Sequence, residues 1–284
     1  MNTSIDEVYD LLADSYLSEQ HSTTKFLYLI QDKPLTDLVA SVRKHNKLPL
    51  GFLEVLVVGA GPTGNSRQTT SGEIPGARDI PKDEALDYDK ITYLDISKRT
   101  LEYLRGSHAE TIFSCGGMYV PGRFVIGNAL ELSQMFLEYS FDIILAGMCD
   151  HIDSQEKFYS EAMKVLGKNG ALITTYPAKE LNTVIREEIY NISSDQTRFI
   201  IKGREYKLPS KIVTNKELKE MYLDSGFDHI TTKNIYFKRS QVEKDPFLKS
   251  QDCKPSETVL KAAKMLKKRL DRIPILVGGI GFKK

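Results

Sequence analysis

Short apolar runs alternate with helical segments through the middle of the chain, and this alternation restricts the fold more than any other feature. The first run is EVLVVGAG, at residues 54–61. An uninterrupted apolar run is typical of a parallel strand buried on both faces, whereas a strand with one wet face alternates polar and apolar residues. Four further runs follow in order: ITYLDIS, RFVIGNA, FDIILAG and ALITTYP. Helical segments separate most of them, so the sequence predicts a doubly wound α/β fold with a mostly parallel sheet.

The two ends of the chain depart from this alternation. Ser4 and Glu7 fit a capping box in front of an amphipathic helix, and a second helical stretch is expected to break at Pro34 and resume until Asn46. Beyond the last central run, RFIIKGREYKL predicts a hairpin around Lys202–Gly203. The remaining expected elements are helices capped by Thr214 and Ser256 and two strands, HITTKNIYFKR and IPILVGGIGF.

Composition excludes several classes of protein. The 284 residues suffice for one main domain, and 39 Lys and Arg against 38 Asp and Glu give a net charge of +1. This balance favours neither nucleic acid nor an anionic membrane as partner. The three cysteines lie far apart without a C-x-x-C pattern, which argues against a disulfide framework and a zinc site. We find no signal peptide or membrane-spanning run, so we expect a cytoplasmic protein.

A glycine motif follows the first apolar run. Gly59, Gly61 and Gly64 fit the G-x-G-x-x-G pattern that lets a backbone approach a dinucleotide pyrophosphate. That pattern requires a helix directly after the third glycine and an acidic residue about 20 positions later. Here residues 65–89 are rich in Gly, Pro, Ser and Asp, and the acidic residue at the end of the next strand, Asp95, lies 31 positions after Gly64. Both departures count against an ordinary NAD or FAD domain.

Five segments, taken in order, resemble the successive motifs of class I S-adenosylmethionine-dependent methyltransferases. They are VLVVGAGPTG, ITYLDISKRTLEYLR, GNALEL, FDIILAGMCDHI and EKFYSEAMKVLGKNGALITTYP, and the likeness covers about residues 54–177. The resemblance implies a seven-stranded sheet that ends in an antiparallel hairpin, with S-adenosylmethionine as the cofactor. It also implies an N-terminal helical cap or lid at residues 1–50. The catalytic domain would then occupy residues 51–284, with a substrate-side insertion at 178–227.

The resemblance also assigns the cofactor site. It implies contacts from Gly59, Ala60, Gly61, Gly64, Asp95, Ile96, Asn128, Ala129, Ala146, Met148 and Tyr16. Asp95 can accept both ribose hydroxyl hydrogens, because a carboxylate offers two oxygens in one plane; alternatively it caps the helix that begins near Ser97. Asn128 stands where the family carries an aspartate near the adenine amino group, and it can instead cap the helix from Leu130. Glycines permit a tight turn against the methionine half of the cofactor.

Cys149, Asp150 and His151 form the densest group of functional side chains, and we take His151 and Asp150 as the candidate catalytic pair. His151 suits a general base at neutral pH, although catalysis by proximity alone would leave it a purely structural role. A nucleophilic Cys149 would need a partner that lowers the pKa of its thiol. Tyr9 and Tyr16 lie seven residues apart, hence on one face of the first helix, where they close over the cofactor or belong to the core.

The expected reaction is methyl transfer to an O, N or C atom of a small molecule, in line and with no metal required. The same cofactor would also serve an aminopropyl or aminocarboxypropyl transferase, or a non-catalytic cofactor-binding subunit. A flavin or NAD oxidoreductase remains the literal reading of GAGPTG. Balanced charge disfavours an RNA methyltransferase. A homodimer stays open.

Overall fold

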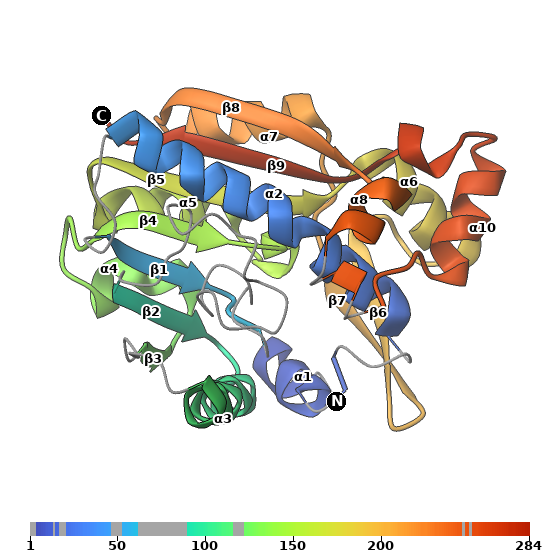
Figure 1. The fold of residues 1–284 in the computed structure, drawn as a ribbon, viewed down its shortest axis with the longest axis horizontal. Coiled ribbons are helices and arrows are strands. Elements are labelled where there is room, and N and C mark those ends of the chain that lie inside the picture. Colours follow the sequence, from blue (N-terminus) through green and yellow to red (C-terminus); the bar gives the residue numbers. More distant parts are fainter. Residues whose placement is uncertain are drawn as a thin grey trace.

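The computed structural model describes residues 4–13, 15–16, 21–46, 53–61, 90–115, 122–245, 248–249 and 252–284. In this part of the chain seven strands form one sheet in the order β3-β2-β1-β4-β5-β9-β8 (Figure 1). Their bounds are β1 Glu54–Val58, β2 Lys90–Asp95, β3 Arg123–Ile126, β4 Phe141–Ala146, β5 Leu166–Pro177, β8 Asp228–Tyr236 and β9 Pro274–Phe282. Strands β1 to β5 run parallel, while β9 is antiparallel to both β5 and β8. The predicted fold class is confirmed.

The central strands are buried on both faces, as their uninterrupted apolar sequences predict. In β1, Val55 and Val57 belong to one hydrophobic core, whereas Leu56 and Val58 belong to the other. Successive side chains of a strand point to opposite faces, so this one short strand contributes side chains to both cores. The carboxyl ends of β1, β2 and β4 therefore meet at one edge of a sheet that is covered above and below.

Helices cover the two faces. On one face α2 (Ser22–Asn46) and α3 (Lys98–Cys115) contribute to the core, and on the other α5 (Gln155–Val165) and α7 (Asn215–Asp224). Figure 1 shows α2 lying across the sheet near β5 and β9. The expected break at Pro34 is wrong, because α2 continues through it. Burial of Leu35 and Leu38, at about 1.5–3 kcal/mol each, offsets the roughly 3 kcal/mol that an interior proline costs.

Two further helices are shorter than their sequences predict. Between β3 and β4 the sequence LELSQMFLEY predicts one helix, but the chain forms a 3-10 turn at Ala129–Glu131 and α4 at Leu132–Met135. The last helix is predicted over ETVLKAAKMLKKRL, which ends at Leu270, whereas α10 covers Glu257–Met265. The remaining helical elements are α6 Lys179–Thr183, a π-helical segment at Val184–Ile189, α8 Arg239–Lys244 and a 3-10 turn at Leu270–Arg272. No helix in the described ranges combines the length and apolar character needed to cross a membrane.

The first helix and the predicted hairpin pack together beside the sheet. Val8 and Leu12 of α1 (Ile5–Leu12) form a small core with Phe199 and neighbouring hairpin residues. The predicted hairpin is confirmed: it consists of β6 Gln196–Ile201 and β7 Arg204–Pro209, and the intervening Lys202–Gly203 has a left-handed backbone. Figure 1 shows both elements at the end toward which the arrows of β1 and β2 point. The expected domain boundary at residue 50 lies outside the described residues, so that division stays a prediction.

Candidate functional site

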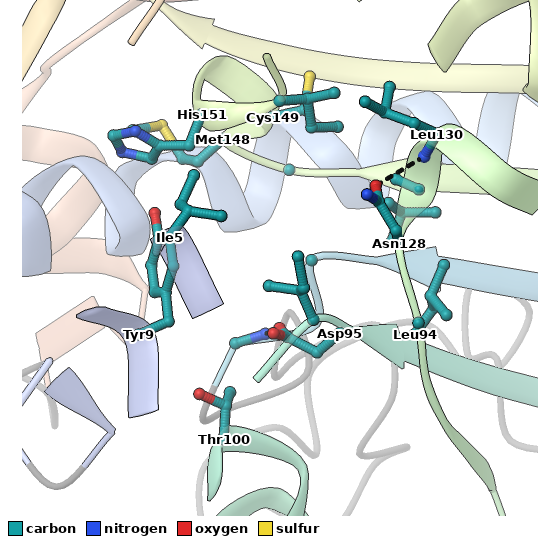
Figure 2. A pocket seen from close by; sticks show the side chains of 18 of the residues that line it. Ile5, Tyr9, Leu94, Asp95, Thr100, Asn128, Leu130, Met148, Cys149 and His151 are labelled. Carbon is teal, nitrogen blue, oxygen red and sulfur yellow. Dashed lines mark hydrogen bonds between the residues drawn. The ribbon is translucent and has the colours of Figure 1, made fainter. Parts of the chain in front are cut away.

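A pocket opens at the carboxyl ends of the parallel strands, where open α/β sheets bind ligands. About 1060 Å³ of empty space lies between its walls, a volume that includes open solvent at its mouth. Its floor comes from the ends of four strands: Gly59 and Gly61 after β1, Asp95 and Ile96 at β2, Gly127 to Leu130 after β3, and Gly147 to Cys149 after β4. Ile5 and Tyr9 of α1 close it from the other side (Figure 2).

The glycine turn after β1 uses the conformational freedom that only glycine has. Gly59 and Gly61 have φ angles of 61° and 63°, a left-handed region that strains other L residues. The turn brings the Gly61 amide to 3.1 Å from Asp95 Oδ2, to which it donates a hydrogen bond. The Ala60 amide donates instead to the Leu94 carbonyl, at 3.2 Å, so Ala60 lies behind the pocket wall. The backbone of the turn is thus tied to β2.

Asp95 is the most buried carboxylate on the pocket wall, with 8% of its surface exposed. Its Oδ1 accepts from the Ser97 amide at 2.9 Å and its Oδ2 from Gly61. Burial raises the pKa of Asp95 to about 6, although these amide bonds oppose the rise, and the nearby Asp10 adds to it. Each oxygen accepts one backbone bond and keeps a second lone pair. The carboxylate therefore supports the start of α3 and still has capacity toward the pocket.

Asn128 performs the capping role that its sequence position allows. Its Oδ1 accepts from the Leu130 amide at 2.9 Å and caps the 3-10 turn that begins at Ala129 (Figure 2). Among the described residues no hydrogen bond is formed by its amide nitrogen. That NH2 group therefore retains its donors, and the residue also lines the pocket.

The turn after β4 is strained and firmly anchored. Met148 has φ 53° and ψ 49°, the left-handed region that a non-glycine residue adopts at a cost. Its amide donates to Thr175 Oγ1 at 2.8 Å, and that hydroxyl donates to Gln31 Oε1 at 2.6 Å. The next residue, Cys149, is buried, and burial raises the pKa of its thiol. A raised pKa leaves the thiol protonated, which is the opposite of what a nucleophile needs.

His151 lines the pocket, whereas Asp150 lies behind it. His151 Nδ1 lies 2.8 Å from the Pro209 carbonyl, so this nitrogen carries a proton and donates. Its Nε2 lies 3.4 Å from Asp150 Oδ2. The buried Asp150 carboxylate also accepts from the Ser210 hydroxyl, and Arg186 Nη2 lies 3.9 Å from Oδ2. Asp150 therefore positions His151 and does not face the pocket.

Aromatic rings surround the end of the pocket nearest His151. The Tyr9 ring lies 6.2 Å from Tyr16, 5.8 Å from His151 and 6.4 Å from Phe199, between centroids. Tyr16 lies beyond α1, which ends at Leu12, so the expectation that both tyrosines share a helix face is wrong. Burial raises the pKa of both phenols, which therefore stay neutral hydrogen-bonding groups. The two rings nevertheless meet beside the pocket.

Comparison with known proteins supports the methyltransferase resemblance over about a third of the chain. Residues 80–174 match the model of the methyltransferase domain family. This match and the fold are consistent with a class I S-adenosylmethionine-dependent methyltransferase domain. None of the curated proteins compared with the chain matches it.

Solved structures of methyltransferases share the fold of this methyltransferase domain. A possible histamine N-methyltransferase from Thermotoga maritima is 17% identical with a TM-score of 0.55, over 99% of this chain and 100% of that one. Phosphoethanolamine N-methyltransferase 2 of Haemonchus contortus, bound to S-adenosylmethionine, is 16% identical with a TM-score of 0.55, over 97% of this chain and 60% of that one. A SAM-dependent methyltransferase from Methanosarcina mazei is 16% identical with a TM-score of 0.52, over 84% and 96%.

The methyltransferase domain brings most of the sequence-derived site residues to one pocket. The following line it: Gly59, Gly61, Asp95, Ile96, Asn128, Ala129, Met148, His151 and Tyr16. Three others are buried behind the wall: Ala60, Ala146 and Asp150. Gly64 lies outside the described residues. The roles assigned to these residues remain predictions.

Sequence reasoning missed several lining residues of the methyltransferase domain. Gly127 directly follows β3, so the rule that ligands bind at strand ends could have found it, and Thr100 lies in the first turn of α3, the helix that follows β2. Tyr28 reaches the pocket from α2, and its ring lies 3.8 Å from the point that a Gly61 Cβ would occupy. No local pattern marks Tyr28, since it contacts a turn more than thirty positions away, as counted along the sequence.

Proposed function

We propose that the protein transfers the methyl group of S-adenosylmethionine to an O, N or C nucleophile of a small molecule, in line and without a metal. The observation that carries this proposal is the arrangement of the pocket walls. The glycine turn and Asp95 form its floor, while Tyr9 of α1 lies opposite. In-line transfer needs mainly alignment of the acceptor with the methyl group, and walls on opposite sides of a pocket can supply it. Two structures of the same fold carry the names of small-molecule N-methyltransferases, which supports a small acceptor.

The cofactor would bind along the floor of the pocket. Asp95 would accept from the two ribose hydroxyls through the lone pairs that Gly61 and Ser97 leave unused. The left-handed turn at Gly59 gives the methionine half room to approach the backbone. Asn128 would donate its NH2 hydrogens to ring nitrogens of adenine, because its oxygen already accepts from the backbone. When bound, the cofactor supplies an electrophilic methyl group on a sulfonium.

His151 would accept the proton that the acceptor loses. The Pro209 carbonyl fixes the proton on Nδ1 and leaves Nε2 as the basic nitrogen. Protonation of Nε2 creates a positive charge 3.4 Å from Asp150 Oδ2, where the carboxylate stabilises it. Arg186 donates to the Ser194 and Ser210 carbonyls, each at 2.7 Å, and so holds the segment that carries these partners.

A calorimetric titration with S-adenosylhomocysteine tests this proposal. We expect micromolar binding to the wild type and a loss of about 1–3 kcal/mol, or roughly five- to 150-fold in affinity, in Asp95→Ala. Asp228→Ala is the matched control, since Asp228 is a half-buried residue of β8 that pairs with Lys284, and β8 is far from the pocket in the strand order. Absence of binding to the wild type would refute the cofactor site. Product mass then separates methyl transfer from aminopropyl or aminocarboxypropyl transfer.

Partners and location remain predictions. The balanced charge of the sequence still argues against nucleic acid and membrane partners. A homodimer and a cytoplasmic location also stay predictions.

A further inference from the structure

Aromatic rings bound the end of the pocket that Tyr9 and His151 line, which we call the acceptor end. Tyr9 lies between Tyr16 and His151, while Phe199 stands behind Tyr9 and His151 at centroid distances of 6.4 and 6.0 Å. Figure 2 shows Tyr9 and His151 on one side of the pocket and Asn128 on the other. The ring faces carry partial negative charge, so a cation bound among them is attracted.

The charged side chains around this end of the pocket are mostly negative. Among the described residues that line the pocket, Asp95 and Asp153 carry carboxylates and none is a lysine or arginine. Asp150 adds a third carboxylate just behind the wall, close enough to both tyrosines to raise the pKa of each phenol. Arg186 offsets part of its charge from the side away from the pocket, near Oδ2. The other oxygen, Oδ1, is buried and accepts from no group within the described ranges.

We propose that the methyl acceptor is a small amine whose nitrogen binds beside Tyr9, Tyr16 and His151. This inference rests on the proposed methyl transfer and names its substrate class. An amine that enters as an ammonium ion first gives one proton to His151 Nε2. Its lone pair then attacks the methyl carbon, and the carbon–sulfur bond breaks with its electron pair moving to sulfur. Positive charge thus passes from the sulfonium sulfur to the amine nitrogen.

The pocket favours this charge movement over the alternatives. As nitrogen becomes positive in the transition state, the tyrosine rings stabilise it, while the Asp150 carboxylate offsets the positive charge that His151 has gained. An alcohol loses a proton and ends as a neutral ether, so the aromatic rings and carboxylates have no positive charge on its product to stabilise. A carboxylate or phosphate acceptor would meet no cationic side chain among the described lining residues and would be repelled by Asp153.

Matched probes separate this inference from the proposed function. Amines, alcohols and carboxylates on butyl, octyl and 2-phenylethyl frames are titrated into protein saturated with S-adenosylhomocysteine. We expect the amine to bind about tenfold or more tighter than the alcohol and carboxylate of its own frame. The same probes, incubated with S-adenosylmethionine, should yield a methylated amine by mass. Failure of S-adenosylhomocysteine to bind refutes the proposed function; binding without an amine preference, including no probe binding at all, overturns only the amine inference.

Two substitutions at Tyr9 test the role of the ring. Tyr9→Leu should reduce the amine-to-alcohol affinity ratio roughly three- to thirtyfold, whereas Tyr9→Phe, the matched control, keeps the aromatic face and most of the ratio. General loosening of α1 weakens the amine and the alcohol alike, so the ratio isolates the interaction with charge. An unchanged ratio in Tyr9→Leu would overturn the proposed position of the nitrogen.

Discussion

Asp95 should make the unliganded protein less stable as pH rises, which is the reverse of the usual effect of a carboxylate. Its folded pKa is about 6, against an ordinary value of 3.8. Because the folded value is the higher one, the favourable contribution is complete below pH 3.8 and is lost as pH rises through 6. A shift of about two pKa units corresponds to about 3 kcal/mol. Only 8% of the residue is exposed, so solvent screens this effect little.

The substitution Asp95→Asn removes this titration and adds a constant cost. The amide oxygen can accept from one backbone N–H, but its NH2 then faces the other donor, Gly61 or Ser97, at a cost of about 1–3 kcal/mol that does not vary with pH. The difference in unfolding free energy, wild type minus variant, should therefore fall by about 2 kcal/mol between pH 4 and pH 8. Asn is thus least harmful at high pH.

Equilibrium urea unfolding measures this difference. The chain contains no tryptophan, so far-ultraviolet circular dichroism is the appropriate signal, recorded at constant ionic strength across pH 4 to 8. The contributions of other titrating groups to the unfolding free energy cancel in this difference, because both proteins contain them. A wild-type-minus-Asp95→Asn difference that is flat, or that grows with pH, would refute the burial argument.

Three further outcomes are expected. The affinity for S-adenosylhomocysteine should fall toward tenfold per pH unit below about 6, because the ribose bonds need ionised Asp95; pH-independent calorimetric affinity would contradict this. Asp10→Ala removes the acceptor that ties α1 to the start of α3, so stopped-flow experiments should show faster ligand release with a stability change of about 1 kcal/mol or less. Leu38→Ala should cost about 2–5 kcal/mol of unfolding free energy, and Leu11→Ala, at an exposed position, much less; equal losses would contradict the placement of α2.

The fold followed from the sequence where burial is two-sided. The run at residues 54–61 had to be a central strand, because both sets of alternating side chains needed a core, and the structure supplies two. Local rules failed at Pro34, since a proline usually ends a helix. The stabilisation that carries α2 through it comes from contacts with strands β5 and β9, which lie more than a hundred residues further along the chain. Long-range burial of that kind leaves no local signal.

Site residues that follow a strand could be predicted from the sequence, whereas those that helices α1 and α2 bring to the pocket could not. Asp95 and Met148 are fixed by strand ends, so counting from the apolar runs locates them. Tyr9 and Tyr28 reach the same pocket from helices whose distance from it depends on how α1 and α2 dock. Asp150 also follows a strand but was not placed correctly: the neighbouring His151 lines the pocket, whereas the Asp150 side chain points toward Ser210.

Protonation state is a further property that the order of residues does not encode. The position after β2 identifies Asp95 as the carboxylate of the site, but its pKa depends on what surrounds it. The Gly61 amide comes from the turn after β1, the Ser97 amide from the start of α3 and the charge of Asp10 from α1. Two of these groups favour the ionised form and one opposes it, while burial outweighs the favourable pair. Without a ligand, the ionised Asp95 carboxylate is therefore less stable in the folded protein than in water. A ribose that donates two hydrogen bonds to it would stabilise the ionised form, and ligand binding is in this way linked to the stability of the folded chain.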